Sequence, residues 1–314
     1  MILALLMSCA TLDSFVFNAV SCSTVGPETC TEPDSVWDRF CTECPDAYAW
    51  DADYDWHETT LEEGERIRAI DPLTVTRIAI ETEDGEGTLD AYFIPSHGMN
   101  PTTASTTIVY NHGNKGNLEH YLPRLRMLHE AGYPLFTWDF RGYGKSKPET
   151  TPDPDQFEAD ALTVYEEALG WATDPERVVV YGFSLGAIPA IGMALDSDPC
   201  ALLLEAPFTS LELTAEGATG VGLGEQMLSE AQYDNMERIK GWKGPLFAFI
   251  GNQDRTFPPE DVRALARASG GPSELWIVKG AGHGLTEGGV PEVGLTPYLQ
   301  RIEGFLGEHD CLTP

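Results

Sequence analysis

Basic residues are scarce in this sequence. Lys and Arg together number 19 against 50 Asp and Glu, which leaves a formal net charge of −31 at pH 7. This balance argues against electrostatic binding of nucleic acid or of anionic lipid headgroups, and it makes neutral or cationic substrates easier to bind. No run of like charges is long enough to form a tail. We therefore expect a solvated acidic surface that keeps the protein soluble.

Long apolar runs are also missing. After residue 20 no stretch approaches the ~20 apolar residues of a membrane-spanning helix. The sequence likewise has no internal repeat and no low-complexity linker, which disfavours two independent domains. Its 314 residues with 42% hydrophobic content match a folded protein with a sizeable core. We expect one large α/β domain with an N-terminal appendage.

The N-terminus opens with the apolar run Met1–Ser8, which leads into Cys9. The segment Leu6–Cys9 resembles a bacterial lipoprotein box. In that family the cysteine is acylated after signal cleavage, so the resemblance implies a mature chain anchored by lipid at Cys9. The run has no Lys or Arg and is short, which leaves a truncated start and a plain apolar N-terminus as alternatives. We expect a bacterial cell-envelope location, lipid-anchored or secreted to the periplasm or cell surface.

Six further cysteines form an even number, which suits an oxidising compartment. Four of them are expected to bridge among themselves: Cys22, Cys30, Cys41 and Cys44. This leaves Cys200 and Cys311 for each other. The CxxC spacing of Cys41 and Cys44 lies in an acidic segment with proline, where neither a redox site nor a zinc site is expected.

Regular patterns begin near residue 75. Strands are expected at Val75–Glu81, Gly87–Ile94, Thr107–Asn111, Leu135–Phe140, Arg177–Tyr181, Ala201–Glu205, Leu246–Ile250 and Glu274–Val278. Helices are expected at Leu118–Ala131, Asp155–Trp171, Leu185–Leu195, Glu225–Ile239, Pro259–Ala268 and Pro291–Gly307. This alternation predicts a doubly wound, mostly parallel eight-stranded sheet with helices on both faces. We divide the chain into a signal-like segment (1–9), an irregular cysteine-containing extension (10–73) and an α/β domain (74–314).

A serine lies between two glycines in Tyr181–Gly186, directly after the β-type run Arg177–Val180. A GxSxG pattern at a strand-to-helix turn is typical of a nucleophile elbow. The turn forces the serine backbone into a strained conformation, and the glycines remove Cβ atoms that would clash. The Ser184 hydroxyl is therefore expected to project above the edge of the sheet.

Two later loops supply partners for this hydroxyl. A serine needs a base as it attacks, usually a neutral histidine oriented by a carboxylate. His283 lies in the glycine-rich loop Lys279–Gly284 after the last strand, and Asp254 lies in Gly251–Pro258 after the strand before it. We expect Ser184 as nucleophile, His283 as base and Asp254 as the acid that orients it.

The order Ser, Asp, His, each after a strand of one sheet, resembles the α/β-hydrolases over about residues 75–307. Asn111–Asn114 resembles the oxyanion loop of that family, and Asp139–Ser146 resembles the Gly-rich turn that follows. Glu205–Ser210 resembles the short-lid, often membrane-associated branch of these serine hydrolases. The resemblance implies that the backbone N–H groups of Asn114 and Leu185 bind the oxyanion, with roughly 10² to 10³ in rate per donor.

Other roles for these residues are possible. Ser184 could be a turn residue, Asp254 a helix cap and His283 a loop histidine, but their presence together favours catalysis. Glu205 is a rival for the acid, because some relatives place the acid after the sixth strand, but in this sequence it is expected to be structural. His112 is expected to orient its own loop rather than to act as a base.

The function expected from these residues is hydrolysis of carboxylic esters through an acyl-enzyme, with a small-molecule ester as substrate and no cofactor or metal. Residues 209–240 leave room for a small lid, so small to medium acyl groups are expected. The alternatives are a peptidase, thioesterase or acyltransferase with the same triad, or an inert lipid-anchored binding protein. No feature of the sequence indicates an oligomeric state.

Overall fold

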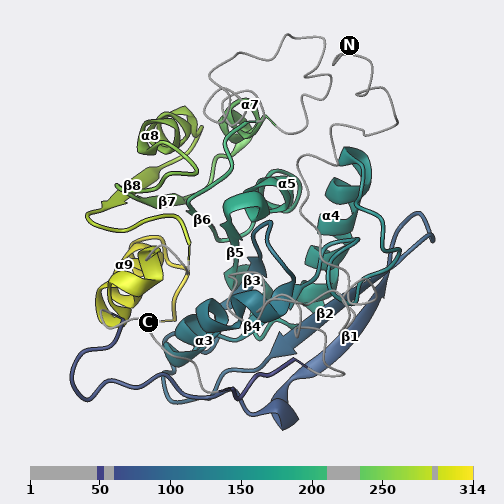
Figure 1. The fold of residues 1–314 in the computed structure, drawn as a ribbon, viewed down its shortest axis with the longest axis horizontal. Helices are drawn as coiled ribbons and strands as arrows, with labels where there is room; N and C mark the ends of the chain where they lie inside the picture. The colour runs from purple at the N-terminus through teal and green to yellow at the C-terminus, as the bar shows by residue number, and fades with distance from the viewer. Residues whose placement is uncertain (1–47, 53–59, 211–233, 285–288, 314) are drawn as a thin grey trace, which may run out of the picture.

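An eight-stranded sheet lies at the centre of the protein (Figure 1). The computed structural model describes residues 48–52, 60–210, 234–284 and 289–313. The strands are β1 (Thr76–Glu81), β2 (Thr88–Ile94), β3 (Thr107–Asn111), β4 (Leu135–Trp138), β5 (Val178–Phe183), β6 (Ala201–Glu205), β7 (Leu246–Gly251) and β8 (Ser273–Val278). They lie in the order β1-β2-β4-β3-β5-β6-β7-β8, and only the β1–β2 and β2–β4 pairs are antiparallel. The predicted doubly wound α/β sheet is confirmed.

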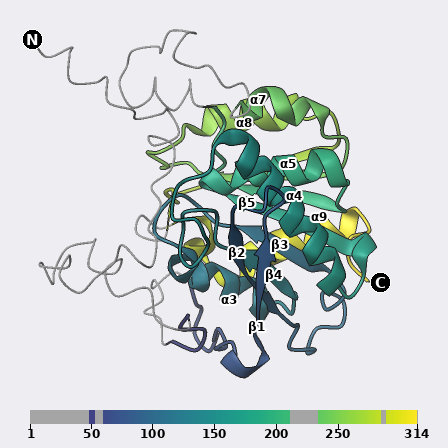
Figure 2. The same ribbon diagram turned by 90° about the vertical axis from the view of Figure 1, so that its right-hand side faces the viewer.

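Helices cover both faces of this sheet. The longer ones are α3 (Leu122–Glu130), α4 (Pro154–Trp171), α5 (Ala187–Ser197), α8 (Pro259–Ala268) and α9 (Leu295–Glu308). Helices α3 and α9 pack on one face, and α4, α5 and α8 on the other (Figure 1). The short helix α7 (Asn235–Arg238) lies beside α8, at the end of the molecule away from β1 (Figure 2). Because both faces are covered, β3, β5, β6 and β7 are buried along their whole length and are largely apolar.

Three expected helices differ from the observed ones, and a fourth lies largely outside the described residues. The helix expected at Leu118–Ala131 opens as a 3-10 turn, η2 (Leu118–Tyr121), before α3 begins. Of the helix expected at Glu225–Ile239, residues 225–233 lie outside the described residues, and α7 covers only Asn235–Arg238.

The helix expected from Pro291 is split into a 3-10 turn, η9 (Val290–Val293), and α9, because Gly294 between them has φ 148° and ψ 131°. The helix expected to start at Leu185 opens as a 3-10 turn, η4 (Ser184–Gly186), before α5 begins.

The described residues before the sheet, 48–52 and 60–75, pack against it and form no strand or helix apart from the 3-10 turn η1 (Pro72–Thr74). Tyr48, Trp50 and Ile70 are buried in the same core as the sheet. Cys9, the next four cysteines and most of the expected lid at 209–240 lie outside the described residues. The division at residues 9 and 73 and the lid therefore stay predictions.

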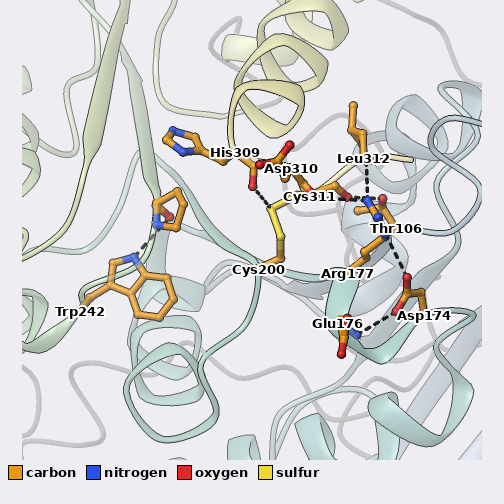
Figure 3. Close-up of a disulfide and its surroundings, with 11 residues drawn as sticks. Thr106, Asp174, Glu176, Arg177, Cys200, Trp242, His309, Asp310, Cys311 and Leu312 are labelled. Carbon is orange, nitrogen blue, oxygen red and sulfur yellow. Dashed lines mark hydrogen bonds and ion pairs between the residues drawn. A yellow bond between two sulfur atoms is a disulfide. The ribbon is translucent and has the colours of Figure 1, made fainter. Parts of the chain in front are cut away.

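The predicted pairing of Cys200 with Cys311 is confirmed, with a Cα–Cα distance of 5.8 Å. This disulfide joins the start of β6 to the chain after α9 (Figure 3). Around it, Thr106 Oγ1 donates to the carbonyl of Cys311 at 2.6 Å, and Arg177 Nη1 donates to the carbonyl of Asp310 at 3.1 Å. The C-terminal segment is thereby fastened to the sheet.

Among the helices of the described residues, none is long and apolar enough to span a membrane.

Candidate active site

Ser184 occupies a strained turn between β5 and α5. Its backbone φ is 53°, in the left-handed region that a residue with a side chain rarely adopts. A Cβ on Gly182 would lie 2.6 Å from the carbonyl oxygen of Gly186, and one on Gly186 would overlap the carbonyl oxygen of Asn111. The two glycines of the pattern are thus required by close backbone approaches, as the sequence predicts.

The three residues expected to act together are adjacent in space. His283 Nε2 lies 3.1 Å from Ser184 Oγ, and His283 Nδ1 lies 2.8 Å from Asp254 Oδ2. An ionised carboxylate can only accept a hydrogen bond, so Nδ1 carries the proton and Nε2 is left to accept the hydroxyl proton. Each residue follows a different parallel strand, and these strands end at the same edge of the sheet.

Asp254 is held in place by its own loop. Its Oδ1 accepts from the backbone N–H of Thr256 at 2.7 Å and of Phe257 at 2.9 Å, while Oδ2 faces His283. The Asp254 side chain has no exposed surface. The sequence also allowed Asp254 to be a helix cap. The N-cap of the following helix α8 is Pro258, so Asp254 does not have that role.

The residues expected to bind an oxyanion follow the neighbouring strands β3 and β5. Leu185 is the next residue in η4, at the start of a helix where N–H groups lack an intrahelical acceptor. Asn114 lies in the loop after β3, and its side-chain Oδ1 accepts from the Tyr143 hydroxyl at 2.6 Å. Leu185 therefore lies in the turn that carries Ser184, and Asn114 follows β3, the strand that pairs with β5.

Glu205 has other partners. Arg124 Nη2 donates to its Oε1 at 3.1 Å and Arg124 Nε to its Oε2 at 3.2 Å, and the Tyr181 hydroxyl donates to Oε2. Glu205 and Arg124 are both fully buried, and the guanidinium lies 3.9 Å from the centre of the Phe183 ring. Glu205 therefore belongs to a buried ion pair beneath the site, in agreement with its expected structural role.

His112 contacts its own loop and the turn after β4. Its ring is buried and stacks on Phe140 at 3.9 Å, and its Nδ1 lies 2.7 Å from the carbonyl oxygen of Gly113. Burial lowers the pKa of His112 to about 3, so the ring is neutral over the physiological range. These contacts agree with a role in holding its own loop.

Sequence reasoning gave no role to two residues near the oxyanion loop. Asp139, after β4, is fully buried and accepts a hydrogen bond from Leu118 N at 2.8 Å. Tyr48 donates its hydroxyl to the same carboxylate. An aspartate at the carboxyl end of a strand was a usable signal, whereas no local pattern marks Tyr48.

Within the described residues no group of His, Cys, Asp or Glu has an arrangement that could hold a metal ion.

Comparisons with known proteins agree with this fold. The family described as "Serine aminopeptidase, S33" matches residues 102–218. An uncharacterised protein of Mycobacterium tuberculosis is 31% identical over 74% of this chain and 79% of its own length. Protein bem46 of Schizosaccharomyces pombe is 28% identical over 76% and 78%. The Pyrococcus furiosus esterase Pf2001 has a TM-score of 0.57 at 26% identity, covering 74% of this chain and 92% of that one.

A doubly wound sheet with a nucleophile turn after β5 defines the class of protein. The chain belongs to the α/β-hydrolase superfamily of serine hydrolases.

Proposed function

We propose that the protein hydrolyses carboxylic esters of small to medium acyl groups through an acyl-enzyme. The proposal rests on the triad: His283 is hydrogen-bonded to both Ser184 and Asp254, and Ser184 lies on a strained turn. The similarity to an esterase of Pyrococcus furiosus supports an ester as the substrate.

In the proposed reaction Ser184 Oγ attacks the acyl carbon while His283 Nε2 takes the hydroxyl proton. The N–H groups of Asn114 and Leu185 stabilise the oxyanion. The bond between the acyl carbon and the alcohol oxygen then breaks, and His283 returns the proton to the leaving alcohol. Water that gives a proton to His283 next attacks the acyl-enzyme, which releases the carboxylic acid and the free Ser184 hydroxyl.

A second candidate is hydrolysis of peptides. The family match over residues 102–218 carries the description of a serine aminopeptidase, and the same triad serves esters and amides. The two functions differ in the leaving group, an alcohol or an amine.

The test compares p-nitrophenyl esters from acetyl to palmitoyl with aminoacyl p-nitroanilides. We expect turnover of the esters with a maximum at short chains, and slow or no release of p-nitroaniline. A maximum at palmitoyl would contradict the small acyl pocket. Faster turnover of the anilides would favour the peptidase.

We also propose that the protein works in the bacterial cell envelope, anchored by lipid at Cys9 or secreted. The Cys200–Cys311 disulfide supports this location because disulfides persist in oxidising compartments. Metabolic labelling with an alkyne fatty acid should mark the wild type and spare Cys9→Ala if the anchor exists. Equal labelling of both proteins would contradict an anchor at Cys9.

A further inference from the structure

The chain before the sheet reaches the loops around the proposed oxyanion site. Tyr48 is 2% exposed, its hydroxyl donates to Asp139 Oδ2, and its ring lies 4.6 Å from Lys145 Nζ. The next residue, Ala49, donates its N–H to the Glu119 carboxylate at 3.1 and 3.2 Å. Asp139 follows β4 and Glu119 lies in the 3-10 turn η2 (Leu118–Tyr121). Two consecutive residues are therefore attached to two different elements of the hydrolase body.

Asp139 faces both ends of the loop 112–117. At the far end of the loop its Oδ1 accepts from Leu118 N at 2.8 Å, and at the near end His112 Nε2 lies 3.6 Å from the same oxygen. Asn114, one of the two residues proposed to bind the oxyanion, lies between these ends. The end of the loop at Leu118 therefore depends on a carboxylate whose other oxygen is bound by Tyr48, whereas His112 Nε2 forms no hydrogen bond with any described residue.

A buried carboxylate needs these donors. Asp139 has no exposed surface, and burial raises its pKa to about 7, while the hydrogen bond from Tyr48 acts in the opposite direction. Loss of that donor would favour the protonated acid, which is a weaker acceptor for Leu118 N–H. Tyr48 therefore affects the backbone that follows Asn114, because it influences the hydrogen bond between Asp139 and the Leu118 N–H.

We propose that Tyr48 is a positioning residue of the active site, which fixes the oxyanion loop 112–117 through the carboxylate of Asp139. This inference rests on the proposed function, since it assumes that the N–H of Asn114 stabilises an oxyanion. It assigns the segment before the sheet a part in building the site.

The test is Tyr48→Phe in the full chain, with Tyr92→Phe as the matched control. Tyr92 is 3% exposed and packs 5.4 Å from the Tyr48 ring, but its hydroxyl donates to Asp90 at 2.5 Å and not to Asp139. The readouts are kcat and KM for p-nitrophenyl butyrate, inhibition by phenylboronic acid, and the melting temperature. Phenylboronic acid forms a tetrahedral adduct with the serine, so its affinity reports the oxyanion site.

We expect Tyr48→Phe to lower kcat by about 10-fold with KM changed less than about twofold, because a displaced oxyanion donor acts only in the transition state. Phenylboronic acid should bind about 10-fold more weakly to this variant. Tyr92→Phe should change kcat and inhibition less than about twofold. Equal effects of the two variants on kcat and inhibition, with or without a fall in melting temperature, would overturn the inference.

Labelling by a fluorophosphonate separates the two proposals. If the wild type turns over no ester but is labelled at Ser184, the ester proposal fails while the labelling rates of the two variants still test Tyr48. A wild type that is neither active nor labelled would overturn both.

Discussion

At the scale of single residues, Glu205 ends β6 and Asp254 follows the neighbouring strand β7, and the two carboxylates differ in their partners. Asp254 Oδ2 lies 2.8 Å from His283 Nδ1, whereas Glu205 is bound by Arg124 and Tyr181. Asp254→Asn should lower kcat for p-nitrophenyl butyrate by about 10⁴-fold, because the amide no longer fixes the histidine tautomer.

The control for this prediction is Glu205→Gln. This change leaves the Arg124 charge buried without a counter-charge, so it should destabilise the fold by about 3–5 kcal/mol. Its kcat, measured on folded protein, should stay far above that of Asp254→Asn. The reverse ranking of the two variants in kcat would assign the acid to Glu205.

Asp139 makes a pH-dependent contribution to stability. Its pKa is about 7 in the folded protein against 3.8 for a free side chain, so the folded state binds more protons between these values. This contribution is fully present below pH 4 and is lost as the pH rises through about 7. Burial lowers the pKa of His112 to about 3, so its contribution makes the free energy of unfolding rise with pH over much of this range. The difference in unfolding free energy between the wild type and Asp139→Asn isolates the contribution of Asp139, because His112 is present in both proteins.

From pH 4 to pH 7 the free energy of unfolding of the wild type should fall by roughly 3 kcal/mol relative to that of Asp139→Asn. Urea denaturation of both proteins at the two pH values measures this difference. A difference that stays constant with pH would contradict a raised pKa for Asp139.

The triad could be predicted from the sequence because each member lies in a loop after a recognisable strand. Ser184 is marked by its two glycines, and Asp254 and His283 follow in chain order. The contacts of Tyr48 with Asp139 and of Arg124 with Glu205 join positions far apart in sequence. Such pairs depend on tertiary packing, which no local pattern encodes.

At the scale of elements, the junction of β5 with α5 depends on a close backbone approach. A Cβ on Gly186 would overlap the carbonyl oxygen of Asn111 at the end of β3. Gly186→Ala should therefore displace the turn, lower the melting temperature and reduce kcat. Gly304, in the middle of α9 and exposed, has no atom within 4 Å of an added Cβ.

Gly304→Ala is the control for this element, and it should stabilise the protein by about 0.5–1 kcal/mol because alanine loses less backbone entropy in a helix. Thermal unfolding and ester turnover of both variants give the comparison. A Gly186→Ala protein as stable and active as Gly304→Ala would show that the approach at Gly186 is not required.

The sequence predicts strands better than helix ends in this protein. The buried strands β3 and β6 have the expected bounds because their apolar residues form short runs between loops. The expected helix at Pro291 did not account for Gly294, whose φ of 148° interrupts it. Apolar periodicity continues across such a break, so the pattern alone does not locate it.

At the scale of the whole molecule, the Cys200–Cys311 disulfide closes a long stretch of chain, with a sequence separation of 111 residues. Replacing both by alanine should destabilise the protein by about 2–5 kcal/mol. Cys200 lies just before β6, at the amino end of that strand. The triad residues instead follow the carboxyl ends of β5, β7 and β8. Turnover at 25 °C should therefore stay near that of the wild type while the melting temperature falls. A loss of kcat without a change in melting temperature would contradict this separation.

In the proposed reaction Ser184 carries the acyl group during ester hydrolysis. The most direct test is mass spectrometry of protein quenched during turnover of p-nitrophenyl butyrate, for the wild type and Ser184→Ala. We expect a butyryl group on the Ser184 peptide of the wild type, and neither adduct nor turnover in Ser184→Ala. Turnover retained by Ser184→Ala, or a butyryl group on another residue of the wild type, would contradict it.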